Sequence, residues 1–226
     1  MTRIAVVGGH GQIARLLHPL LLEAGHQPVA LVRTQEHADA LTAEGVETRF
    51  LDIEDSTDAD FATAFDGCRG VVFAAGGGPD GNIERKRTVD LEGSLKSIAG
   101  ADTAGIRRFV QVSAISVDGP LPDDVDAVWK AYVEAKRDAD AALRASNLAW
   151  TIVRPGKLTD DAGTGRVAVG PNVERGEIPR ADVAAVVAAV LADDRTVAHQ
   201  WNVVSGDDAI VDAITGAVAA YSASDE

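Results

Sequence analysis

The sequence contains a single cysteine, Cys68, among 226 residues. One thiol cannot form a disulfide within the chain, and it cannot build a metal site of the cysteine-cluster type. We therefore expect Cys68 to be buried or incidental, and we expect no bound metal ion.

Long apolar runs are also missing. No stretch approaches the roughly 18 apolar residues of a transmembrane helix. Residues 1–7, MTRIAVV, lead straight into a glycine turn, unlike the charged start and apolar core of a signal peptide. These absences predict a cytoplasmic protein with no part embedded in a membrane.

Positive charge is in deficit, because 21 Lys and Arg residues stand against 35 Asp and Glu residues, which gives a net charge of −14. Nucleic acids and anionic membranes are bound by clustered Lys and Arg. The sequence therefore predicts neither as a partner and favours a small-molecule substrate. It leaves the oligomeric state open.

The sequence does contain a regular alternation of strand-like and helix-like segments. Several early strands are continuous apolar runs, as in a parallel sheet that is covered on both faces. Such alternation is typical of βαβ units, and we expect one α/β domain over residues 1–226, a Rossmann-type doubly wound parallel sheet. An irregular loop on the substrate side is expected over 155–179. The expected strands cover 3–7, 28–33, 48–51, 70–75, 108–113, 150–154 and 200–204, and the expected helices cover 11–24, 35–44, 56–65, 83–104, 125–146, 181–192 and 209–221.

Three glycines stand in four positions where the first strand meets the first helix, in VVGGHGQIA. Gly8 would permit the tight turn, and Gly11 would let a pyrophosphate approach the backbone at the positive end of the helix. The pattern follows a strand and opens a helix, which is the context that makes it a dinucleotide site. His10 lies inside this turn, where its backbone N–H matters, whereas His18 is expected on the helix surface.

The end of the second strand bears on the choice of dinucleotide. Val32 stands where NAD-binding proteins usually have an acidic residue, and Arg33 follows it. A guanidinium suits the 2′-phosphate of NADP, so NADP is predicted and NAD stays open. Asp52 and Ile53 would lie beside the adenine. The segment AAGGGPDG, residues 74–81, would lie near the adenine ribose and the pyrophosphate, through Ala74, Ala75 and Gly76.

Tyr132 and Lys136 are the candidate catalytic pair, because a spacing of four places both on one helix face. A lysine beside a tyrosine favours the phenolate, so we expect a lowered pKa for Tyr132. Such a tyrosine can give a proton to a carbonyl that is being reduced. Lys136 could also hold the nicotinamide ribose.

Together these residues resemble the short-chain dehydrogenase/reductase superfamily, and within it the atypical NAD(P)-binding branch with NmrA-like and flavin-reductase-like members. The resemblance covers nearly the whole chain, through VVGGHGQIA, LVR, LDIED, RFVQVSAISV, YVEAK, TIVRPGKLT and IPRADVA. It implies that Pro155 borders the nicotinamide and that the pair Tyr132 and Lys136 is catalytic. The residues implied to hold the pyrophosphate are Gly8, His10, Gly11, Gln12 and Ile13, with Arg33 at the 2′-phosphate.

One position departs from the superfamily pattern. Ala114 stands where a Ser or Thr usually polarises the substrate carbonyl, between Ser113 and Ser116. Ser113 is our provisional carbonyl donor, and Ser116 is the other candidate.

Three functions remain open on the sequence alone. The first is an NAD(P)H-dependent oxidoreductase that reduces a small carbonyl, quinone or flavin-type acceptor. The second is a non-catalytic NADP(H)-binding redox sensor, which the displaced hydroxyl favours. The third is an NAD(P)-dependent epimerase or dehydratase, against which the short C-terminal region argues.

Overall fold

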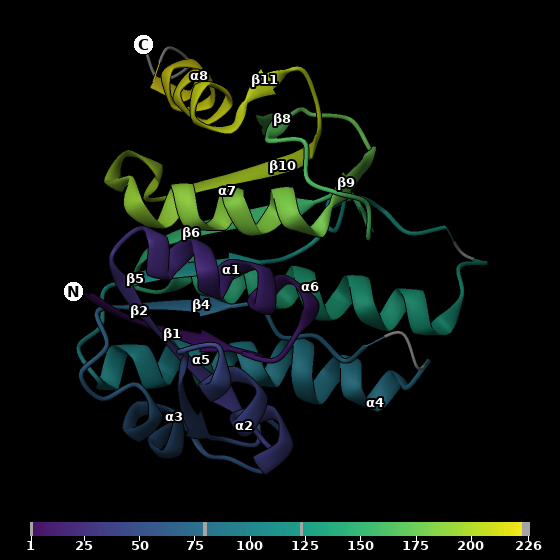
Figure 1. The fold of residues 1–226 in the computed structure, drawn as a ribbon. Coiled ribbons are helices and arrows are strands. Elements are labelled where there is room, and N and C mark those ends of the chain that lie inside the picture. Colours follow the sequence, from purple (N-terminus) through teal and green to yellow (C-terminus); the bar gives the residue numbers. More distant parts are fainter. Residues whose placement is uncertain (1, 79–80, 123, 223–226) are drawn as a thin grey trace.

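The fold is described from a computed structural model, over residues 2–78, 81–122 and 124–222 (Figure 1). Seven strands run parallel in the order β10-β6-β5-β4-β1-β2-β3. This matches the predicted doubly wound sheet. The strands are β1 (Thr2–Val7), β2 (His26–Val32), β3 (Glu47–Phe50), β4 (Gly70–Phe73), β5 (Arg108–Val112), β6 (Ala149–Pro155) and β10 (His199–Ser205).

Helices cover both faces of the sheet. On one face α1 (Gln12–Glu23) and α7 (Arg180–Ala192) lie side by side, and they share an apolar core with α8 (Ile210–Ser222). On the other face α3 (Asp58–Ala64), α5 (Gly93–Thr103) and α6 (Ala127–Ala145) enclose a second core. The short helix α2 (Gln35–Ala43) packs on β2 and β3. No helix in the described ranges combines the length and the apolar character that a membrane crossing needs.

The segment 155–179 is more ordered than predicted. It contains β7 (Lys157–Thr159), β8 (Arg166–Gly170) and β9 (Glu177–Pro179). β7 and β9 pair with each other, whereas β8 joins the main sheet antiparallel to β10 and carries β11 (Asp208–Ala209) at its edge. The prediction of an irregular loop was wrong here, because these short strands depend on pairing with distant residues.

The predicted helix over 83–104 is interrupted. The structure has a short α4 (Ile83–Arg85), then a π-helical segment η1 (Lys86–Glu92), then α5. Lys86 and Asp90 of η1 are buried although they are charged. π-Helical turns often occur at functional sites, so η1 is a candidate position for one.

The strands β1, β2, β4 and β5 run parallel, so their carboxyl ends lie at the same edge of the sheet, at the right in Figure 1. The turn into α1, the turn into α2 and the start of α6 therefore meet at this edge, which is where ligands bind in open parallel α/β sheets. The π-helical segment η1 packs against α6 near the same edge.

Candidate functional site

The glycine turn after β1 depends on the absence of side chains. Gly8 has φ +77°, and a Cβ on it would lie 2.7 Å from the Cα of Ala75. A Cβ on Gly9 would lie 2.6 Å from the Cβ of Ala30, which leaves no room for it. Gly8 thus permits the turn and its approach to the loop after β4, and Gly9 permits its approach to β2.

The first turn of α1 is open to an anion. Gly11 is the N-cap residue and has no side chain that could cap the helix, and the first turn, Gln12 to Ala14, contains no acidic residue. Its free backbone N–H groups and the helix dipole fit a pyrophosphate group. Gln12 is exposed at this turn, whereas Ile13 is buried and anchors the helix in the core.

A cleft of about 240 Å³ opens beside the glycine turn. It gathers nine of the residues that the sequence assigned to a cofactor, whereas Gln12, Ile13, Lys136 and Pro155 do not line it. Residues 79 and 80 of the predicted glycine-rich segment lie outside the described part of the chain. The cleft is lined by Gly8, His10, Gly11, Arg33, His37, Leu51, Asp52, Ile53, Glu54, Ala74, Ala75, Gly76, Arg85 and Val89.

Arg33 is the exposed cation at the mouth of this cleft, directly after β2. It forms no salt bridge with any residue that the structure describes. Three other charged residues line the same cleft: Arg85 Nε lies 3.5 Å from a carboxylate oxygen of Glu54, and Asp52 accepts the backbone N–H of Glu54 at 3.0 Å. Arg33 is therefore available for an anionic ligand.

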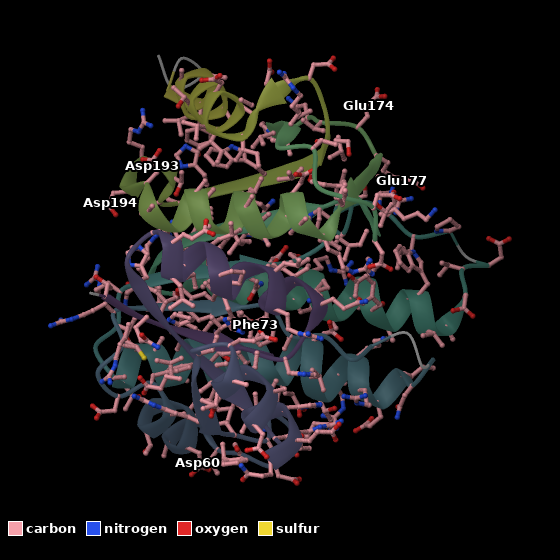
Figure 2. All side chains as sticks on the ribbon, in the orientation of Figure 1. Asp60, Phe73, Glu174, Glu177, Asp193 and Asp194 are labelled. Atoms are coloured by element: carbon pink, nitrogen blue, oxygen red, sulfur yellow. The ribbon has the colours of Figure 1, made fainter. Side chains whose placement is uncertain are left out.

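Lys136 is buried at the carboxyl ends of β4 and β5. Its Nζ lies 3.1 Å from Oδ1 of Asp90 and donates to the carbonyl oxygens of Val112 (3.3 Å) and Ala75 (3.4 Å). Burial alone would lower the pKa of Lys136, but the carboxylate of Asp90 raises it above its usual value. Lys136 is thus held as an ammonium ion. Its Nζ also lies 5.9 Å from the ring centre of Phe73, which Figure 2 labels near the middle of the molecule.

Tyr132 lies one turn before Lys136 on α6, as predicted. Burial raises the pKa of Tyr132, and although Lys136 lowers it, Asp90 and Asp140 raise it further. The expected lowering of this pKa was wrong, because burial of the phenol outweighs the effect of Lys136, whose charge Asp90 also partly balances. Tyr132 therefore remains a phenol at neutral pH and can donate a proton.

Two more side chains flank the Tyr132 ring. The ring of Trp129 lies 5.4 Å away, and Nζ of Lys86 lies 5.9 Å from the ring centre. Lys86 also donates to the carbonyl oxygen of Gly78, in the loop after β4. Lys86 is thus a second cation near the phenol, in addition to Lys136.

Ser113 is placed at the end of β5, but its hydroxyl is engaged. Ser113 Oγ donates to Oδ2 of Asp140 at 2.7 Å, and Gln111 donates to Oδ1 of Asp140 at 2.7 Å. Arg154 donates its Nε–H to Asp140 at 2.8 Å and pairs with Asp118 through its terminal nitrogens. Burial raises the pKa of Asp140, and Arg154 partly offsets this.

Ser116 and Pro155 lie close to this network in the chain. Ser116 is exposed, with φ +62°, in the left-handed region that non-glycine residues rarely adopt. Pro155 is buried at the end of β6, and its carbonyl oxygen accepts the N–H of Ile115 at 3.0 Å.

Sequence reasoning missed four charged or titratable residues of the site: Lys86, Asp90, Asp140 and His37. Asp140 could have been found, because it follows Tyr132 and Lys136 at helical spacing on the same face of α6. Asp90 is far from Lys136 in the sequence, and no local sequence pattern predicts that the two side chains form an ion pair. His18, expected on the surface, is buried, and its Nε2 lies 2.7 Å from the carbonyl oxygen of Gly9.

An open glycine turn, a cleft at the carboxyl edge and an available arginine after β2 define a dinucleotide-binding protein of the Rossmann class. The chain belongs to the NAD(P)H-binding family, whose model matches residues 8–194. Its cofactor is therefore a nicotinamide dinucleotide, and both NADP(H) and NAD(H) fall within the family description.

Several relatives are similar over most of this chain. An uncharacterized sugar epimerase from Bacillus subtilis, YhfK, is 36% identical over 213 residues, which are 94% of this chain and 98% of that protein. Among solved structures, a candidate NAD-dependent epimerase/dehydratase from Bacillus halodurans superposes with a TM-score of 0.88, at 36% identity, and covers 96% of this chain and 100% of that one. ChuY, an anaerobillin reductase from Escherichia coli O157:H7, has a TM-score of 0.75 at 25% identity and covers 92% of this chain and 98% of its own.

Proposed function

We propose that the protein is an NADPH-dependent reductase that transfers hydride to a small carbonyl, quinone or flavin-type acceptor. The observation that carries this proposal is Tyr132, kept as a phenol beside the buried pair of Lys136 and Asp90 at the carboxyl edge of the sheet. Family membership and the reductase among the relatives support it. Arg33, which has no acidic partner among the described residues, supports the choice of NADPH.

Each cofactor-binding residue has a proposed place. The glycine turn, with Gly8, His10, Gly11, Gln12 and Ile13, would hold the pyrophosphate, and Arg33 would hold the 2′-phosphate. Asp52 and Ile53 would border the adenine, and the segment from Ala74 to Gly76 would border its ribose. Lys136 and Pro155 would define the nicotinamide end, where Lys136 already contacts the carbonyl oxygen of Ala75.

Bound NADPH would supply the hydride in this reaction. Tyr132 would donate its phenolic proton to the substrate oxygen that gains charge, and the nearby ammonium of Lys136 would stabilise the phenolate that is left. Asp90 would keep Lys136 charged and in place. Ser113 could polarise the same oxygen only if its hydroxyl turned away from Asp140.

Tyr132→Phe tests the proposal, and Tyr221→Phe is the matched control, because Tyr221 lies on α8, away from the site. We expect Tyr132→Phe to lower kcat by about 100-fold or more with NADPH and a carbonyl acceptor, since general acid catalysis contributes at least that much. The Kd for NADPH should stay unchanged, and the control should keep full activity.

Two other outcomes would contradict the proposal, one for the role of Tyr132 and one for the reductase activity. If Tyr132→Phe reduced the acceptors as fast as the unmodified protein, Tyr132 would not be the acid. If the unmodified protein bound NADPH but reduced no carbonyl, quinone or flavin, the sensor hypothesis would take its place. The engagement of the Ser113 hydroxyl with Asp140 is the observation that favours a sensor.

An epimerase is the second enzymatic candidate, because two relatives at 36% identity carry epimerase names. Such an enzyme keeps its oxidised dinucleotide bound through the reaction. It would release NAD(P)⁺ on denaturation of the purified protein, whereas a reductase that exchanges its cofactor would release little. Absorbance of the denatured supernatant distinguishes the two.

A further inference from the structure

Two histidines stack face to face at the mouth of the dinucleotide cleft. The ring centres of His10 and His37 are 3.8 Å apart, and the ring planes differ by 10°. Both residues line the cleft together with Arg33. His10 comes from the glycine turn after β1, and His37 comes from the first turn of α2.

We propose that this imidazole pair forms, with Arg33, the pocket for the 2′-phosphate of NADP(H), and that the pair takes up a proton when the phosphate binds. The preference for the phosphorylated dinucleotide would then grow as the pH falls. This inference deepens the proposed function and rests on it for the dinucleotide in the cleft.

The backbone holds the pair at the place where the two turns meet. The backbone N–H of His37 donates to Oγ1 of Thr34, the N-cap residue of α2, at 3.3 Å. His10 is fixed between two glycines whose backbone packs against β2 and α1. In a dinucleotide-binding fold the β2–α2 turn faces the adenosine ribose, so the imidazoles and Arg33 converge on its 2′-position.

The charges around the pair come from four directions. Arg15 and the buried His18 lie on α1, Glu36 lies on α2, and Glu44 directly follows α2, with a guanidinium nitrogen of Arg15 3.9 Å from its carboxylate. Arg33 follows β2. Asp52, Glu54 and Arg85 also line the cleft.

Without a ligand this environment disfavours a charged pair. Burial lowers the pKa of His10, and His37 and Arg15 lower it further, against a smaller opposite effect of Glu36 and Glu44. Two imidazolium rings in face-to-face contact would also repel each other, which opposes a second proton on the stacked pair. A phosphate dianion beside the rings would supply the missing opposite charge.

The sign of the pH dependence follows from proton linkage. If the complex binds more protons than the free protein, affinity rises as the pH falls. The 2′-phosphate itself has a pKa of about 6, so its own protonation in acid weakens the binding of the nucleotide. A preference that increases in acid therefore has to come from the protein.

The probes are 2′,5′-ADP and 5′-AMP, which differ only in the 2′-phosphate and need no nicotinamide chemistry. Calorimetry at about pH 6 and about pH 8, which span the range where imidazole titrates, gives the ratio of the two Kd values at each pH. We expect the preference of the unmodified protein for 2′,5′-ADP to be about fivefold greater at the lower pH. Titrations in two buffers with different heats of ionisation should show more proton uptake with 2′,5′-ADP than with 5′-AMP, because the 5′-phosphate is common to both probes and its own proton exchange cancels in the comparison.

The double variant His10→Asn/His37→Gln removes both imidazoles. Its preference for 2′,5′-ADP should fall in acid instead of rising, because only the phosphate then titrates, and its affinity for 5′-AMP should stay the same. His26→Gln is the matched control, because His26 lies at the opposite, amino end of β2. It should behave as the unmodified protein does.

Other results would contradict either this inference or the proposed function. A preference of the unmodified protein that is constant or falls in acid, or an absence of proton uptake, would overturn this inference and leave hydride transfer untouched. The same holds if both nucleotides bind equally. If neither nucleotide binds, the dinucleotide cleft fails, and the proposed function fails with it.

Discussion

At the scale of single residues, the buried ion pair of Asp90 and Lys136 should govern local stability. Asp90→Asn leaves the ammonium of Lys136 buried without its carboxylate, and we expect a loss of about 3 kcal/mol in the free energy of unfolding. Urea denaturation at neutral pH measures it. The double variant Asp90→Asn/Lys136→Met should be more stable than the sum of the two single effects predicts, because no charge is then stranded. Strict additivity would mean that the two side chains do not interact in solution.

The same pair makes a pH prediction with a definite sign. The pKa of Lys136 in the folded protein is raised above its usual value. The charge of Lys136 therefore stabilises the fold fully at any pH below the usual pKa. This stabilisation is lost as the pH rises from the usual pKa through the raised one. In Asp90→Asn, burial is no longer offset, and the pKa of Lys136 should drop below its usual value. The destabilisation by Asp90→Asn should therefore shrink as the pH rises into the alkaline range. Unfolding curves recorded across that range for both proteins check this, and a constant difference would contradict it.

At the scale of elements, two glycines should respond to alanine in opposite directions. A Cβ on Gly9 would lie 2.6 Å from the Cβ of Ala30 and 2.8 Å from its Cα, so Gly9→Ala must push the turn off β2. We expect a loss of about 2 kcal/mol, typical of overpacking. A Cβ on Gly216, within α8, would meet no atom of the described residues within 4 Å outside the adjoining backbone of its own helix, so Gly216→Ala should stabilise the protein by about 0.5–1 kcal/mol. Thermal and urea unfolding of both variants test the pair, and equal effects would contradict the packing argument.

Elements with local signals could be predicted, and elements that depend on distant partners could not. The seven parallel strands are largely apolar runs between turn residues, and the glycine turn and Arg33 follow from their order along the chain. β8 escaped prediction because it pairs with β10 and because Gly206 lies against its backbone, where a Cβ would be 2.4 Å from the nitrogen of Ala168. The partners of Lys136 and His10 were missed for the same reason, since Asp90 and His37 meet them only in the folded chain.

At the scale of the whole molecule, the net charge of −14 should oppose compaction. Figure 2 labels Asp60, Glu174, Glu177, Asp193 and Asp194 around the outside of the fold. Several of the ion pairs that could compensate are exposed, such as Lys157 with Glu177, whose side chains are 77% and 60% exposed, and exposed pairs contribute little. Screening by salt should therefore remove more repulsion than attraction.

The resulting prediction is a Tm that rises with sodium chloride. Between very low salt and about 0.3 M the Debye length falls below the spacing of most surface charges, and the rise should level off there. A gain of about 1 kcal/mol corresponds to roughly 2–4 °C for a chain of this size. Scanning calorimetry at several salt concentrations distinguishes screening, which saturates, from general salt effects on apolar burial, which continue to grow. A Tm that falls on addition of salt would mean that the short-range pairs, with Lys136–Asp90 and Arg154–Asp140 buried among them, outweigh the long-range repulsion.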